Sequence, residues 1–150
     1  MPLEQVLQGS YFSIENPIRL FDRWVNSYRH QCRVQLNGKN LLLKWSARAE
    51  RVLSNKPEPL IVEMQLYFSC LVKKRVLFHD QAEFETQVVN DHLQIAFRPI
   101  EAAKCDPEEF ARNYPLGRVL DSSAALKMTP SWVGIDFRQG QWEGEFGYQV

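Results

Sequence analysis

Residues 60–72 have the sequence LIVEMQLYFSCLV, and this stretch decides the expected fold. Every second side chain from Leu60 to Val72 is apolar, and most of the positions between them are polar. This alternation is typical of a β-strand with one face in the core and the other partly in water. The expected wet face carries Glu63, Gln65, Tyr67 and Ser69.

The basic run Lys73-Lys74-Arg75 follows this strand and leaves its end open to two interpretations. A three-residue turn over the run would pair Val72 with Val76 in a hairpin, although such turns usually contain Gly or Asn. A single strand continuing through Phe78 would place each side chain on the same face as the hairpin would. The alternation therefore leaves both alternatives open.

Three other loops predict antiparallel hairpins, because each brings apolar side chains of two strands to a common face. The expected pairs are Leu36 with Leu41, Val34 with Leu43 and Cys32 with Trp45 around a Gly38-Lys39 loop; Val88 with Leu93, Thr86 with Ile95, Phe84 with Phe97 and Glu83 with Arg98 around an Asn90-Asp91 loop; and Phe137 with Trp142, Ile135 with Gly144 and Val133 with Phe146 around a Gln139-Gly140 loop.

Helical signals occur at three places. An Asn-Pro pair followed by apolar residues at helical spacing predicts an amphipathic helix over residues 17–30. Residues 46–55 are rich in Ala, Arg and Glu behind a capping Ser46, which favours a short helix over a continued strand. A capping Asp, a first-turn Pro and a following Glu predict a short helix over residues 106–113. Residues 118–130 have no clear period and predict a loop with one short element.

These elements predict a single α+β domain over residues 1–150. We expect an antiparallel sheet of about six to eight strands built from hairpins, with the N-terminal helix packed on one face and a short helix near residue 110. A β-sandwich or a strongly curled half-barrel would satisfy the same alternation.

Charge and cysteine usage limit the partners and the compartment. The chain has 18 basic and 18 acidic residues, so no global field attracts nucleic acid, and weak mutual repulsion favours self-association. Three cysteines without a C-x-x-C pair suit a reducing compartment. The sequence shows neither a signal-peptide pattern nor an apolar run of about 18 residues. We therefore expect a cytoplasmic protein without a membrane partner.

Catalytic signatures are missing from the sequence. It contains no P-loop, G-x-G-x-x-G, G-x-S-x-G or H-E-x-x-H motif, and common nucleotide enzymes are therefore disfavoured. The three cysteines with His30, His79 and His92 could in principle build a metal or thiol site, and His30-x-Cys32 is the only close pair. A cysteine on an apolar strand face is more often a small buried hydrophobe. The sequence predicts no catalytic residue, metal or cofactor.

Two groups of residues are candidates for function. A groove over the polar face of residues 60–72 would bind a small molecule, with ligand-binding candidates Glu63, Gln65, Tyr67, Ser69, His79 and Cys105. Basic residues and the aromatic residues of the terminal hairpin are candidates for a protein interface, namely Lys73, Lys74, Arg75, Trp132, Trp142, Phe146 and Tyr148.

The first functional hypothesis is a non-enzymatic binding or assembly module that self-associates through sheet edges or the aromatic hairpin. The alternative is a small-molecule binding protein or enzyme with its pocket over the polar strand face. A deep pocket there would favour the alternative, and a flat apolar patch would favour the assembly module.

Overall fold

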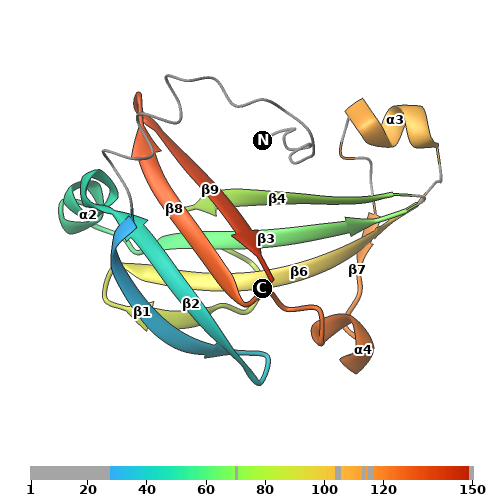
Figure 1. Ribbon diagram of the computed structural model, residues 1–150, viewed down its shortest axis with the longest axis horizontal. Coiled ribbons are helices and arrows are strands. Elements are labelled where there is room, and N and C mark those ends of the chain that lie inside the picture. The colour runs from blue at the N-terminus through green and yellow to red at the C-terminus, as the bar shows by residue number, and fades with distance from the viewer. Residues whose placement is uncertain (1–27, 70, 104–105, 113, 115–116, 149–150) are drawn as a thin grey trace.

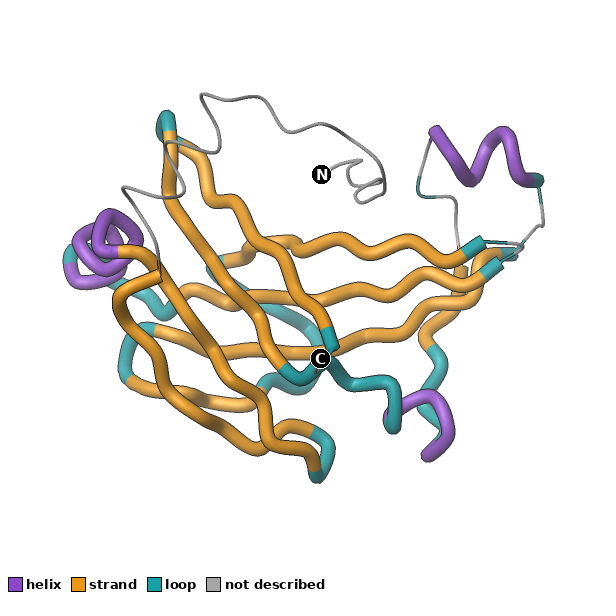
Figure 2. The backbone as a smooth tube through the Cα atoms, in the orientation of Figure 1, coloured by secondary structure: helices purple, strands orange, loops and turns teal. Residues whose placement is uncertain are grey.

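The computed structural model describes residues 28–69, 71–103, 106–112, 114 and 117–148. Figure 2 shows that strands joined by short turns make up most of this part of the chain, with small helices at its periphery. The elements are β1 (Tyr28–Leu36), β2 (Lys39–Ser46), α2 (Ala47–Ser54), β3 (Leu60–Phe68), β4 (Val72–His79), β5 (Gln87–Asn90), β6 (Leu93–Ala102), α3 (Pro107–Arg112), β7 (Gly117–Val119), α4 (Ser123–Leu126), β8 (Trp132–Arg138) and β9 (Gln141–Gly147).

The strands form two mixed sheets. Sheet A has the order β1-β2-β8-β9, and sheet B has the order β4-β3-β6-β5 with β7 also paired to β6. The central pairs β2–β8 and β3–β6 are parallel. The other pairs are antiparallel, and all of them except β6–β7 are hairpins. The strands of sheet A run obliquely across those of sheet B (Figure 1), β9 lies against β4, and β1 approaches β5.

The expected antiparallel sheet covered by an N-terminal helix is therefore wrong. Each sheet buries its apolar face against the other sheet, so the architecture is the sandwich-like alternative. Residues 17–27 of the expected helix lie outside the described residues, and residues 28–30 belong to β1. In the described part of the chain no helix is long and apolar enough to cross a bilayer.

One core lies between the sheets. Leu43 from sheet A and Ile95 from sheet B are both fully buried in it. Strand β3 is buried on both faces along most of its length, as expected for a central strand with a parallel neighbour. The buried core residues are Leu36, Leu41, Leu43, Trp45, Ala49, Leu53, Leu60, Val62, Met64, Leu66, Leu93, Ile95, Phe97, Val133, Ile135 and Phe146.

The first hairpin turns at Asn37-Gly38 rather than at the expected Gly38-Lys39. Both residues have positive φ, 52° and 79°, which is typical of a type I′ turn. The register is therefore displaced by two positions, and Cys32 pairs with Leu43. An even displacement keeps the same side chains on the core face, so the predicted facing holds although the predicted pairs are wrong.

The hairpin of β5 and β6 also departs from its predicted register. A bulge between Val88 and Asn90 places Asn90 opposite Leu93 and leaves Val88 58% exposed. The predicted pairing of Val88 with Leu93 is wrong, because the bulge turns Val88 outward and Val89 towards the core. The predicted partner of Glu83, Arg98, forms an ion pair with Glu63 instead.

The terminal hairpin of β8 and β9 confirms its prediction. Phe137 pairs with Trp142, and the other two expected pairs, around the Gln139-Gly140 turn, also form. For the basic run, the hairpin alternative is confirmed, because β3 pairs antiparallel with β4, but the expected turn over residues 73–75 is wrong. The turn comes before the basic run, so Phe68 pairs with Val72 and the basic run lies within β4.

Two of the predicted short helices are confirmed. Ser46 caps α2, and its Oγ accepts a hydrogen bond from the backbone N–H of Ala49 at 3.1 Å. Asp106 caps α3, and its Oδ1 accepts from the backbone N–H groups of Glu108 and Glu109. Helix α4 is the helical segment in the stretch with no clear period.

Candidate functional site

The polar row of β3 lies on the face of sheet B that points away from sheet A. Glu63, Gln65 and Tyr67 are nevertheless buried, with 2%, 5% and 5% exposure. Strands β4 and β6 flank β3 on both sides, and their long side chains lie over the row. The row is thus covered, and its polar groups need partners within the protein.

Glu63 is the centre of a hydrogen-bonded network on this face. Its Oε1 lies 2.7 Å from Nε2 of His79, and its Oε2 accepts from Arg98 Nη1 at 3.0 Å and from Gln65 Nε2 at 2.6 Å. Burial alone would raise the pKa of Glu63, but the hydrogen bonds from these three side chains outweigh burial and lower it. Glu63 is therefore a buried anion at neutral pH.

His79 and Arg98 connect this buried carboxylate to the surface. Their side chains are 31% and 30% exposed. The ring of Phe84 packs edge-on against His79 and lies 4.5 Å beneath the Arg98 guanidinium. The hydrogen bonds to Glu63 therefore hold two side chains that remain partly exposed to solvent.

A second set of contacts continues along the same face. Gln65 Oε1 accepts from Arg75 Nε at 2.6 Å, and the Arg75 guanidinium lies 4.1 Å from the centre of the Tyr114 ring. Lys73 Nζ lies 4.1 Å from the same ring. Burial and then the charge of Arg75 lower the pKa of Lys73, and burial raises the pKa of Tyr114. Cationic side chains thus gather around one buried carboxylate, an arrangement suited to an anion.

The basic run does not form one patch, because adjacent strand residues point to opposite faces. Lys73 and Arg75 lie on the outer face of sheet B with Tyr114. Lys74 points to the other face, where its Nζ donates to the backbone carbonyl of Phe146 at 2.9 Å. Burial lowers the pKa of Lys74. Lys74 therefore joins β4 to β9.

The aromatic residues of the terminal hairpin are mostly packed. Phe146 is 2% exposed in the core, and Trp142 packs against Phe78 and Phe137. Trp132 is half-buried, with Lys44 Nζ 4.6 Å from its ring centre. Tyr148 is 39% exposed, its hydroxyl donates to the backbone carbonyl of Met128, and burial raises its pKa to about 12.

The structure brings together four of the six ligand-binding candidates. Glu63, Gln65 and His79 are hydrogen-bonded, and Tyr67 lies in the same row. Ser69 is in the β3–β4 turn, where its backbone N–H donates to the Leu71 carbonyl. Cys105 lies outside the described residues.

Three members of this network were absent from the candidates named from the sequence, namely Arg98, Phe84 and Tyr114. Arg98 reaches Glu63 because β6 lies parallel beside β3. No local pattern in the sequence indicates that neighbour, since β4 and β5 lie between the two strands in the sequence. The predicted register of β5 and β6 instead assigned Arg98 to Glu83.

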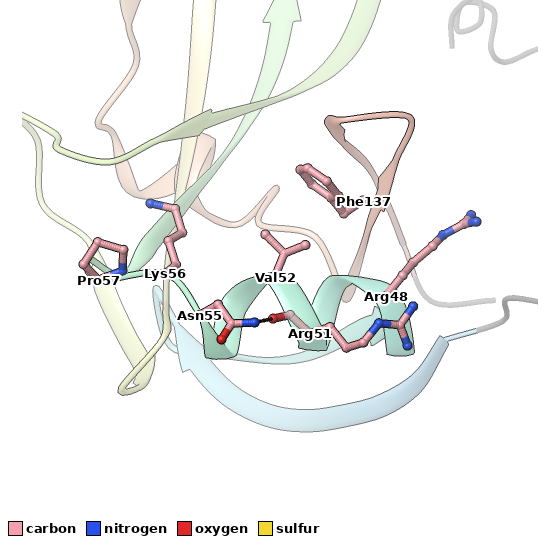
Figure 3. Close-up of a pocket in the computed structure, with 7 residues that line it drawn as sticks. All are labelled: Arg48, Arg51, Val52, Asn55, Lys56, Pro57 and Phe137. Carbon is pink, nitrogen blue, oxygen red and sulfur yellow. Dashed lines mark hydrogen bonds between the residues drawn. The ribbon is translucent and has the colours of Figure 1, made fainter.

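A shallow hollow of about 610 Å³ lies beside α2 (Figure 3). Val52 and Phe137 lie in it, and Arg48, Arg51 and Lys56 surround it. Two of these cations already have carboxylate partners. Arg48 makes a bidentate ion pair with Asp136, and Lys56 pairs with Asp80.

The partner of Arg48 also fixes the start of α2. Asp136 accepts a hydrogen bond from Ser46 Oγ at 2.5 Å and from the backbone N–H of Phe137. Burial alone would raise the pKa of Asp136, but these bonds and Arg48 lower it. The ion pair of Arg48 with Asp136 therefore attaches α2 to β8. Of the three cations beside the hollow, Arg51 is the one without an ion-pair partner among the described residues.

The third candidate site is the edge of sheet A at β1. We name the side of β1 opposite β2, where its outward backbone groups lie, the β1 edge. β1 has nine residues, and Arg29, Gln31, Arg33 and Gln35 are exposed while the residues between them are half-buried. Among the described residues, no strand pairs with the β1 edge. Cys32 lies at the middle of β1 as a free thiol, and burial raises its pKa.

Comparisons with protein-family models, with curated protein sequences and with solved structures find no match to this chain. Within the described ranges, no group of three or more His, Cys, Asp or Glu side chains is arranged to hold a metal ion.

Proposed function

We propose that this chain is a non-enzymatic assembly module that associates with itself through the β1 edge. The observation that carries this proposal is a nine-residue outer strand whose backbone hydrogen-bonding groups on one side meet no strand of the described chain. Such an edge is a template for pairing with another strand. A formal net charge of zero adds little repulsion between copies.

The other sheet edges are less suited to pairing. β4 carries the basic run, its Lys74 carbonyl lies 3.4 Å from the Tyr114 hydroxyl, and it packs against β9. A covering side chain is a recognised way of protecting an edge, and β4 is covered by Tyr114 and packs against β9 more extensively than β1 contacts β5. β5 and β7 have four and three residues, which is short for an intermolecular ladder. The β1 edge is therefore the best candidate.

Light scattering coupled to size-exclusion chromatography tests this proposal. We expect the mass to rise with concentration from 17.6 kDa towards twice that value. Gln31→Pro should remove an edge donor and shift the mass back to that of the monomer. Gln81→Pro, in the exposed loop after β4, should leave association unchanged. A wild-type chain that stays monomeric at every concentration would refute the proposal.

We propose a cytoplasmic location for this assembly. The free thiol of Cys32 and the odd number of cysteines support a reducing compartment. Cell fractionation of the tagged full chain, with thiol labelling before lysis, tests this assignment. Recovery in an oxidising compartment with the cysteines blocked would contradict it.

The network around Glu63 supports a second candidate function, the binding of a small anion over the polar face of β3. Arg75, His79 and Arg98 are half-buried, and Glu63 is the carboxylate bonded to two of them. Isothermal titration with inorganic phosphate and with acetate tests this function. We expect Arg75→Gln to weaken binding and Arg51→Gln, beside α2, to leave it unchanged. Absence of binding to either anion would refute it.

A further inference from the structure

The geometry of the first turn determines which backbone groups of β1 face outward. A type I′ turn at Asn37-Gly38 closes with a hydrogen bond from the Lys39 N–H to the Leu36 carbonyl. Hydrogen-bonded and non-hydrogen-bonded positions then alternate along the antiparallel pair. Val34 and Cys32 direct their backbone groups to β2, and Gln31, Arg33 and Gln35 direct theirs to the β1 edge.

A second copy can pair with this edge only in certain registers. Opposed residues in a ladder share a face, so a symmetric antiparallel pairing must be centred on a residue of β1. Centring it on Arg33 places that arginine opposite itself, and centring it on Gln31 places Arg29 opposite Arg33. Both registers oppose like charges, which is destabilising.

The register centred on Cys32 avoids this repulsion. It places Gln31 opposite Arg33 of the second copy and Arg29 opposite Gln35 of the second copy. It also uses the full length of the strand, whereas centres nearer either end shorten the ladder. From His30 to Leu36, a stretch that includes the centre at Cys32, β1 pairs with β2 without a register shift and therefore offers a regular edge.

We propose that two copies of this chain pair their β1 strands antiparallel about a twofold axis beside Cys32, joining the two A sheets into one. This inference rests on the proposed self-association and names its partner, symmetry and register. The Cys32 pair is a non-hydrogen-bonded position, where opposed Cα atoms lie about 4.5 Å apart. That spacing is within the range that a disulfide bond spans.

Oxidation with diamide tests the register directly. Two Cys32 thiols lose two protons and two electrons to diamide, which is reduced to its hydrazine, and one disulfide forms between the copies. We expect peptide mapping of the oxidised wild-type chain to recover the Cys32–Cys32 linked peptide. Cys32→Ser should abolish that peptide, and reduction before digestion should release it. Oxidised dimers linked only through other cysteines would overturn the register.

A charge substitution at Gln31 tests the register without cysteine chemistry. In the proposed register, Gln31→Glu faces Arg33 of the second copy, and Gln31→Arg faces the same arginine with like charge. We expect about a 3-fold to 10-fold tighter dimer for Gln31→Glu and a correspondingly weaker one for Gln31→Arg in sedimentation equilibrium, because each dimer contains two such cross-strand pairs. Gln81→Glu is the matched control.

Weaker association of Gln31→Glu would overturn the register, because a ladder centred on Gln31 would place the new carboxylate opposite itself. A chain that dimerises but gives no Cys32–Cys32 peptide after oxidation would refute this pairing and leave self-association standing. A chain that is monomeric in both experiments would refute both proposals. Thermal unfolding of each variant at low concentration shows whether the monomer is folded.

Discussion

Replacing Glu63 with glutamine keeps the size of the side chain and removes the charge at the centre of the network on sheet B. Three donors lose a charged acceptor, and each such hydrogen bond contributes about 1.5–3 kcal/mol. Removing one partner of a buried ion pair lowers the free energy of unfolding by about 3–5 kcal/mol. His79 and Arg98 are 31% and 30% exposed, so water can solvate them after release. We therefore expect Glu63→Gln to lower the free energy of unfolding by about 2–3 kcal/mol at neutral pH.

The same substitution has a defined pH dependence. The folded-state pKa of Glu63 is lowered, so its stabilisation is complete above the unfolded value of about 4.3 and is lost as the pH falls through the folded pKa. The gap between wild type and Glu63→Gln should therefore close in acid. Urea unfolding followed by tryptophan fluorescence at neutral and acid pH measures it. Glu83→Gln, an exposed control, should change stability by less than about 0.5 kcal/mol. A Glu63→Gln variant as stable as wild type at neutral pH, or a gap that persists in acid, would refute this reasoning.

Three further substitutions test the fold. Leu43→Ala opens a cavity at a fully buried position and should lower the free energy of unfolding by about 2–5 kcal/mol. Leu71→Ala, at a side chain that is 49% exposed, should lower it by less than about 1 kcal/mol. Equal losses in urea unfolding would contradict the two-sheet core. Ser46→Ala removes the cap of α2 and its bond to Asp136, so the unfolding free energy should fall by about 1–2 kcal/mol, and the exposed Ser54→Ala should have little effect. Gly117→Ala would place its Cβ 2.4 Å from the Glu101 carbonyl oxygen. Amide exchange of Leu120, whose N–H donates to the Pro99 carbonyl at 2.8 Å, should therefore accelerate. Unchanged exchange would contradict the pairing of β7 with β6.

Side-chain facing could be predicted from the sequence more reliably than strand partners. The alternation from Leu60 to Val72 identified the polar row of β3, and the network around Glu63 contains three of the residues named from that row and its surroundings. The terminal hairpin was predicted in full, because its Gln139-Gly140 turn and its apolar pairs agree with each other. Facing is a local property with a period of two residues.

The parallel contacts could not be predicted, because nothing local encodes which hairpin lies beside which. Strand β6 is inserted beside β3, and this placement brings Arg98 to Glu63 and buries the row expected to be wet. The predicted strand registers were wrong where the turn residues or a bulge had been assigned wrongly. At the first hairpin Asn37 and Gly38 adopt the positive φ values, and at the second a bulge at Val89 turns Val88 outward. The β1 edge likewise becomes evident only after the order of sheet A is known.

Residue-resolved hydrogen exchange of β1 at low and high protein concentration tests assembly through the β1 edge most directly. The N–H groups of Cys32 and Val34 should be protected at both concentrations, because they bond to β2. Those of Gln31 and Arg33 should exchange rapidly in dilute solution and become protected in concentrated solution, as a second strand covers them. Rapid exchange of Gln31 and Arg33 at every concentration would contradict assembly through this edge.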